Sequence, residues 1–135
     1  MKGWYGKAKR DHLKKLLGWD TDEMRPLLVT AAYTPNKNVD EFMSDIPGGA
    51  LVTGGLGDAL TSKAVSDAGV ISAANGYVSA VPAGQFPRLI VIVQYTGVAA
   101  TSRLICYNNE GIPLPIETDG SDVHLRWPTA GIGEI

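Results

Sequence analysis

The segment Arg88–Tyr95 constrains the fold more than any other part of the sequence. Residues 89–93 read Leu-Ile-Val-Ile-Val, a continuous apolar run rich in β-branched side chains. Such a run predicts a strand that is covered on both faces, because neither face carries the alternating polar residues of a solvent-facing strand. We therefore expect this strand to lie at the centre of a sheet.

Glycine and proline divide the rest of the chain into short segments. The sequence has 16 glycines and 8 prolines among 135 residues. Short strand-like segments between turn signals, at a spacing of about ten residues, are typical of sandwiches and barrels. We predict a mainly β protein: a compact β-sandwich or barrel-like domain over residues 19–135, with further strands at residues 27–30, 102–107 and 123–127.

The segment Gly54–Ala59 has the glycine content of a phosphate-binding loop but not its pattern. It lacks the Gly-Lys-Ser/Thr ending of a P-loop, and Leu60 stands where a dinucleotide fingerprint has its third glycine. We interpret this segment as a flexible loop.

Residues 4–17 have the periodicity of an amphipathic helix. The residues near its apolar face are Trp4, Tyr5, Ala8, His12, Leu13, Leu16 and Leu17. The lysines lie largely on the opposite face, and Gly18 suits the position where a helix ends. We predict an N-terminal amphipathic helical arm over residues 1–18, separate from the β domain, so that deletion of residues 1–17 would leave that domain folded.

The charge of the chain is unevenly distributed. Residues 1–17 carry six lysines and arginines and one aspartate, a net charge of +5, whereas residues 18–135 have a net charge of −7. A basic end on an acidic body suggests docking on a neighbouring protein, on another copy of the chain or on nucleic acid, although a solvated helix face would carry the same lysines. The residues that we predict to bind a partner are Trp4, Tyr5, Lys7, Lys9, Arg10 and Lys14.

The residue types of catalytic and metal sites are scarce. His12 lies in the basic segment, His124 lies on the polar side of a predicted strand, and neither has a partner pattern of a nucleophile site. Cys106 lies in an apolar run, where burial would raise rather than lower the pKa of its thiol. The acidic clusters at residues 20–23 and 117–122 do not have the spacing of a calcium loop. We predict no enzyme activity, no cofactor and no metal.

The longest apolar run has five residues, against about 20 for a membrane-spanning helix. We expect no membrane segment, and no apolar stretch of signal-peptide length follows the N-terminus. Synthesis in the cytoplasm is therefore the expected starting point.

Several segments of the sequence together have a familiar order and spacing. These segments are Gly18–Asp22, Tyr33–Asn36, Asp40–Phe42, Ser44–Ile46, Val93–Gly97, Thr101–Tyr107, Gly120–Val123 and Arg126-Trp127. With them the chain resembles a family of small virion structural proteins of tailed bacteriophages, encoded among head and tail genes. The resemblance spans most of residues 18–132 and carries no catalytic or ligand-binding residues with it.

The resemblance implies a non-enzymatic structural role in the virion. The role that we expect is that of a capsid decoration or cement protein, which stabilises the head by binding major capsid subunits or copies of itself in a homo-oligomer or larger assembly. The alternatives are a head–tail connector, a tail or baseplate component, and a fibre or receptor-binding module. Nucleic acid is not the expected partner, because the body of the chain is acidic and no recognition motif accompanies the basic segment.

Overall fold

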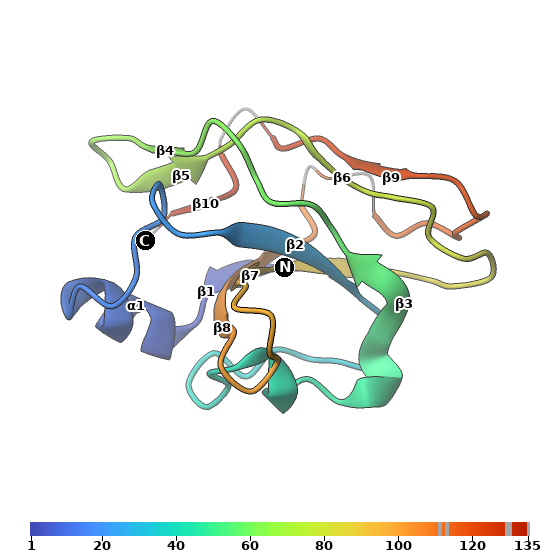
Figure 1. Cartoon of the computed structure of the whole chain (residues 1–135), viewed down its shortest axis with the longest axis horizontal. Helices are drawn as coiled ribbons and strands as arrows, with labels where there is room; N and C mark the ends of the chain where they lie inside the picture. Colours follow the sequence, from blue (N-terminus) through green and yellow to red (C-terminus); the bar gives the residue numbers. More distant parts are fainter. Residues whose placement is uncertain (111, 113, 129–130, 135) are drawn as a thin grey trace.

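The structure is a computed structural model that describes residues 1–110, 112, 114–128 and 131–134. Its centre is a five-stranded antiparallel sheet with the order β1-β8-β7-β2-β3 (Figure 1). The five strands are β1 (Lys2–Trp4), β2 (Met24–Val29), β3 (Leu51–Leu56), β7 (Leu89–Gln94) and β8 (Arg103–Asn108).

Short elements surround this sheet. One small sheet has the order β10-β5-β4, and another pairs β6 with β9. Their bounds are β4 (Ala64–Val65), β5 (Val70–Ser72), β6 (Gly76–Val78), β9 (Val123–Leu125) and β10 (Gly133–Glu134). The helices are α1 (Gly6–Leu13) and two 3-10 turns, η1 (Met43–Asp45) and η2 (Gly48–Ala50).

Strand β7 is the centre of the core, as its sequence predicts. All five residues from Leu89 to Val93 are buried, and the strand pairs with β2 on one side and β8 on the other. Its two rows of side chains face different layers. Ile92 is in register with Cys106 and Trp4 on the face that β10 covers, whereas Val91 is in register with Tyr107 on the opposite face.

The two layers lie on opposite sides of the central sheet (Figure 1). On one side are the short strands, where Asn108 Nδ2 donates to the carbonyl of Ile132 at 3.0 Å. On the other side is the segment with the two 3-10 turns, where the amide of Met43 donates to the carbonyl of Ser102 at 2.8 Å. Both faces of β7 are thus covered, which confirms the prediction for this strand.

Pro26 lies inside β2, which has a neighbouring strand on both sides. The carbonyl of Pro26 accepts a hydrogen bond from the amide of Gly57 at 2.7 Å. In a strand the nitrogen and the carbonyl of one residue point to the same side, so the proline ring nitrogen faces Gly57, just beyond the end of β3. The pairing of β2 with β7 therefore loses no hydrogen bond.

The interpretation of Gly54–Ala59 as a flexible loop is wrong for its first three residues. Gly54, Gly55 and Leu56 belong to the edge strand β3. A Cβ at Gly55 would lie 2.8 Å from the carbonyl oxygen of Val52, and one at Gly57 would lie 2.7 Å from Pro26 Cγ. These two glycines are needed because the backbone is closely approached here, not because a phosphate has to be held.

The mainly β character of the fold is confirmed, but a sandwich or barrel is not. In the part of the chain that the structure describes, the three sheets are separate and none closes on itself. The strands predicted at residues 102–107 and 123–127 are present as β8 and β9. In β9 Val123 and Leu125 are buried and His124 is exposed, as the alternation predicts.

The predicted arm is part of the same core. The helix covers Gly6–Leu13 instead of residues 4–17, and Lys2–Trp4 form a strand that pairs with β8. Trp4, Tyr5 and Ala8 are buried together with the residues of the central sheet. No boundary of the core falls at residue 18, and the separate arm is corrected to an edge strand followed by a packed helix.

Cys106 is buried in β8, as expected, and its burial raises the pKa of the thiol to about 12. At pH 8 the fraction of molecules with an ionised thiol is then on the order of one in ten thousand, and the buried sulfur is out of reach of a reagent in solution. We expect a disulfide exchange reagent to leave the native protein unmodified and to modify one thiol per chain in urea. Rapid modification of the native protein would contradict the burial of this side chain.

Candidate partner-binding surface

Helix α1 is held at both ends by the backbone. The amide of Tyr5 donates to Ile105 in β8, and the amide of Gly6 donates to Lys37 at 2.7 Å. At the other end Lys15 adopts a positive φ of 60°. The amides of Lys15 and Leu16 donate to the carbonyls of His12 and Asp11, which is the Schellman arrangement that ends a helix. The helix therefore stops four residues earlier than the apolar pattern predicts.

The inner face of this segment contains a chain of hydroxyl groups. The hydroxyls of Tyr5 and Tyr33 lie 2.8 Å apart, and Tyr33 donates to Asp40 Oδ2 at 2.7 Å. Since the Tyr33 proton points to Asp40, Tyr5 is the donor of the first bond. Burial raises the pKa of both phenols, so they remain protonated and the chain of hydrogen bonds holds over the physiological range.

A buried carboxylate joins α1 to the central sheet. Asp11 is only 2% exposed, and its two oxygens accept from Arg10 Nε at 2.8 Å and from Arg103 Nε at 3.0 Å. Burial by itself would raise the pKa of Asp11, but the hydrogen bonds and charges of the two guanidinium groups outweigh it and hold the pKa below its usual value. Arg103 belongs to β8, so this carboxylate fixes the helix on the sheet.

Two of the predicted partner-binding cations have partners within the chain. Arg10 Nη2 lies 3.0 Å from Glu41 Oε2, and Lys7 Nζ lies 3.5 Å from Glu41 Oε1 and donates to the carbonyl of Val39. These side chains hold α1 against the segment that leads into η1. Glu41 thus neutralises part of the positive charge of the segment within the molecule.

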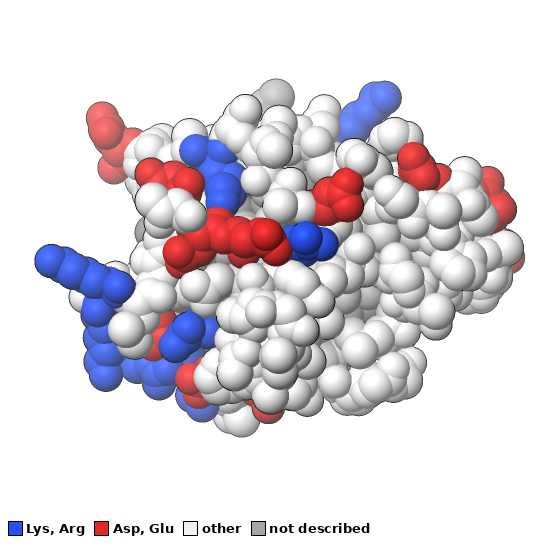
Figure 2. Space-filling view, viewed as in Figure 1, with Lys and Arg blue, Asp and Glu red and all other residues white. Residues whose placement is uncertain are grey.

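The outer face of the segment combines lysines with exposed apolar side chains. Leu13 is 86% exposed and Leu16 is also exposed. In the described part of the chain, Lys9, Lys14 and Lys15 are exposed and form no ion pair. Figure 2 shows basic side chains gathered at the end of the molecule where α1 lies. We call Lys9, Leu13, Lys14, Lys15 and Leu16 the α1 surface.

The structure thus divides the predicted partner-binding residues into three groups. Trp4 and Tyr5 are buried in the core and do not belong to the exposed face of the segment. Lys7 and Arg10 bind Glu41, while Lys9 and Lys14 are exposed and form no ion pair with any residue that the structure describes.

Sequence reasoning missed Lys15, Leu16 and Leu13 as members of this surface. Lys15 directly follows Lys14, and its charge could have identified it as a further residue of this surface. The apolar periodicity placed both leucines on the packed face, but Leu13 at the end of α1 and Leu16 beyond it are exposed.

A cavity of about 330 Å³ opens beside Leu13. The residues that line it are Trp4, His12, Leu13, Gly18, Trp19, Asp20, Val65 and Ile71. Trp4, Trp19 and Ile71 are buried, whereas Leu13 and Val65 are exposed. We call this space the Leu13 cavity.

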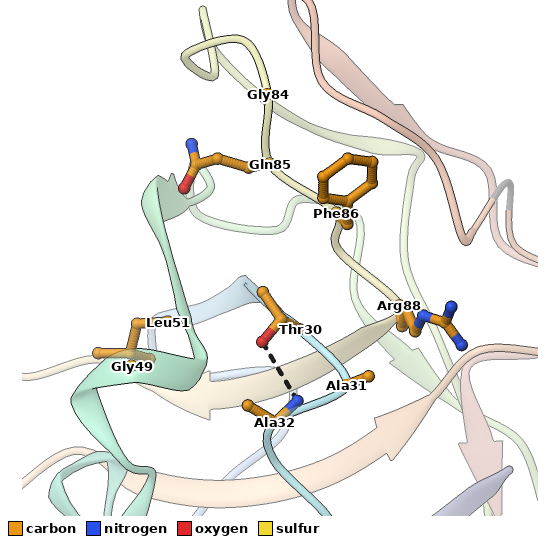
Figure 3. A pocket seen from close by; sticks show the side chains of 9 residues that line it. All are labelled: Thr30, Ala31, Ala32, Gly49, Leu51, Gly84, Gln85, Phe86 and Arg88. Carbon is orange, nitrogen blue, oxygen red and sulfur yellow. Dashed lines mark hydrogen bonds between the residues drawn. The ribbon is translucent and has the colours of Figure 1, made fainter.

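A second cavity, of about 370 Å³, lies at the opposite edge of the sheet beside β3 (Figure 3). The segments around Thr30, Gly49 and Gln85 line it together with Phe86 and Arg88. Gln85 binds the edge strand through Thr53, whose amide donates to Oε1 at 2.6 Å and whose carbonyl accepts from Nε2 at 3.1 Å. The lining contains one cation and no carboxylate, imidazole or thiol, so it holds no acid–base pair.

No protein-family model matches the chain, and comparison with curated proteins finds no match. Among the described residues, no helix has the length and apolar character needed to cross a membrane. Within the same residues, no group of three or more histidines, cysteines and carboxylates is placed to hold a metal ion.

Proposed function

We propose that this chain is a non-enzymatic structural protein of a bacteriophage virion, and that it acts as a decoration or cement protein on the capsid. The α1 surface is the observation that carries the proposal. It presents Leu13 and three lysines that have no ion-pair partner among the described residues, on and directly after a helix that Asp11 fixes to the core. The partner is the major capsid protein or another copy of the chain.

The physical character of the α1 surface supports a binding role. Leu13 is 86% exposed, and a partner that covers this apolar side chain removes it from water, which favours binding. Lysines around it favour an acidic partner and raise the rate of encounter. Because the helix is already packed on the sheet, little conformational entropy is lost when the partner binds.

The resemblance to small virion structural proteins supplies the virion as the place where this surface acts. The mainly β fold agrees with that role. Connector, tail and fibre roles would use the same surface with different copy numbers.

The first test is the stoichiometry of the chain in purified particles relative to the major capsid protein, measured by quantitative mass spectrometry. A ratio near one supports the decoration role. A ratio of a few per cent moves the protein to the neck, tail or fibres, and its absence from particles overturns the virion proposal.

The exposed lysines should control the salt dependence of assembly. We expect the double variant Lys9→Gln, Lys14→Gln to bind particles about three- to tenfold more weakly at low salt, because exposed ion pairs contribute about 0.2–1 kcal/mol each. Its binding should also vary less with salt than that of the wild type, since salt screens charge pairs. The measurement is a binding isotherm on particles lacking the protein at two or more salt concentrations.

The double variant Lys7→Gln, Arg10→Gln is the matched control, because it removes the same charge from the same helix. Lys7 already binds Glu41, and Arg10 binds both Glu41 and the buried Asp11, so we expect a loss of stability, measured by urea unfolding, but a salt dependence of particle binding close to that of the wild type. Equal effects of the two double variants on the salt dependence would contradict a specific role of the α1 surface.

A further inference from the structure

The Leu13 cavity has the form of an anchor pocket. Its floor is apolar and well packed: Trp4 is 5% exposed and Trp19 is 1% exposed. Its rim is open, since Leu13 from α1 and Val65 from β4 both stand in solvent. A side chain that entered would be covered by aromatic and aliphatic groups on several sides, which is how the central residues of an interface are usually held.

Two residues that line this cavity have ring nitrogens that form no hydrogen bond within the described part of the chain. Among the described residues, the side-chain nitrogens that are buried and form no hydrogen bond are Trp4 Nε1 and His12 Nε2. Both residues line the Leu13 cavity, and their rings meet edge to face at 5.8 Å.

The charge around the rim favours an acidic occupant. Lys9 lies one helical turn before Leu13 on the same side of α1, and Lys14 and Lys15 follow it directly. Asp20 is the one carboxylate among the lining residues, on the loop that precedes β2. The three lysines outnumber it, and they form no ion pair within the described residues.

We propose that the Leu13 cavity binds an apolar side chain from a segment of a partner protein that carries carboxylates on either side of that residue. The apolar side chain fills the space between Leu13, Val65 and Trp19, and the carboxylates meet Lys9, Lys14 and Lys15. Nucleic acid does not fit this cavity, because the two tryptophan rings are buried and offer no face on which a base could stack. The inference rests on the partner-binding role of the α1 surface proposed above, but not on the virion as its location.

The test uses the full chain and three synthetic peptides in a titration followed by ¹H–¹⁵N nuclear magnetic resonance. The peptides are acetyl-Glu-Glu-Leu-Leu-Glu-Glu-amide, its lysine counterpart with the same leucines, and its serine counterpart with the same glutamates. We expect only the first to bind measurably, and to move the indole resonance of Trp4. The indole of Trp127 already donates to Ala74 at 2.9 Å and does not line the cavity, so its resonance serves as the internal reference.

Leu13→Glu should weaken binding of the first peptide by about tenfold or more. It removes apolar contact, and it adds a negative charge that repels the carboxylates of the peptide. Val98→Glu is the control, since Val98 is exposed and does not line the cavity. Both variants should keep the urea unfolding midpoint of the wild type.

Three results would overturn the inference. The first is equal binding of the leucine and serine peptides, and the second is preference for a single-stranded oligonucleotide over the first peptide. The third is self-association of the wild type, seen by sedimentation and abolished by Leu13→Glu, which would make a second copy the occupant. None of them alters the stoichiometry measured in particles, so the virion proposal is judged separately.

Discussion

Deletion of residues 1–17 is expected to abolish the fold. The deletion removes the edge strand β1, the buried side chains of Trp4, Tyr5 and Ala8, and the carboxylate that faces Arg103. Truncating one buried aromatic side chain costs about 3–5 kcal/mol, whereas whole domains are stable by about 5–15 kcal/mol. The loss of two such side chains and a strand therefore consumes most or all of the stability.

The measurement is urea unfolding followed by near-ultraviolet circular dichroism. The truncated chain should show no cooperative transition, and the Lys9→Gln, Lys14→Gln variant, which changes the same segment only at its surface, should unfold like the wild type. A cooperative transition of the truncated chain would contradict this expectation and support the separate arm that the sequence predicts.

Replacement of Asp11 by alanine is expected to cost about 2–3 kcal/mol of unfolding free energy. The substitution leaves Arg103, a partly buried cation, without its carboxylate, and the loss of one partner of a buried pair is strongly destabilising. The exposed part of Arg103 can be solvated, which keeps the expected cost below that of a fully buried pair. Urea unfolding at pH 7 gives the value, provided that the slope of free energy against urea is unchanged.

The same substitution has a predicted pH dependence. The pKa of Asp11 is lower in the folded chain than in the unfolded chain, so its stabilising contribution is complete above the unfolded pKa of about 3.9 and is lost as the pH falls through the folded pKa. The wild type and the alanine variant should therefore approach equal stability below about pH 4. Glu41→Gln is the control, since its ion pairs are partly exposed and should contribute about 1 kcal/mol or less. Equal stability of the Asp11 variant and the wild type at pH 7 would contradict the role of the buried carboxylate.

The parts of the fold that the sequence predicts are those with a local cause. Residues 89–93 are apolar on both sides, and the burial of β7 follows directly from that composition. The alternation at residues 123–125 predicts β9 for the same reason. In these segments the side chains themselves carry the information about which face is covered.

The N-terminal segment was mispredicted because its structure depends on distant residues. Lys2–Trp4 contain a glycine and a lysine and have little strand preference, but β8 supplies a partner for each of the three residues. The helix ends early because Lys15 takes a positive φ, for which lysine gives no local signal.

The candidate site was also predictable only where its features have a local cause. The exposure of Lys9 and Lys14 follows from helical periodicity, which places them on the polar face. The pairing of Lys7 and Arg10 with Glu41 joins residues 31 or more positions apart, and no local pattern encodes it. The Leu13 cavity brings α1 together with β4 and β5, and only the folded chain reveals it.

The position of β1 beside β8 also sets the order in which the molecule can assemble. Residues 2–4 are synthesised about 100 residues before their partners at residues 106–108. At about 10 residues per second, the basic segment with its tryptophan and tyrosine waits roughly ten seconds before its place in the sheet exists. The first strand of the central sheet to be made therefore docks last, and the nascent chain exposes Trp4 and Tyr5 until β8 has been synthesised.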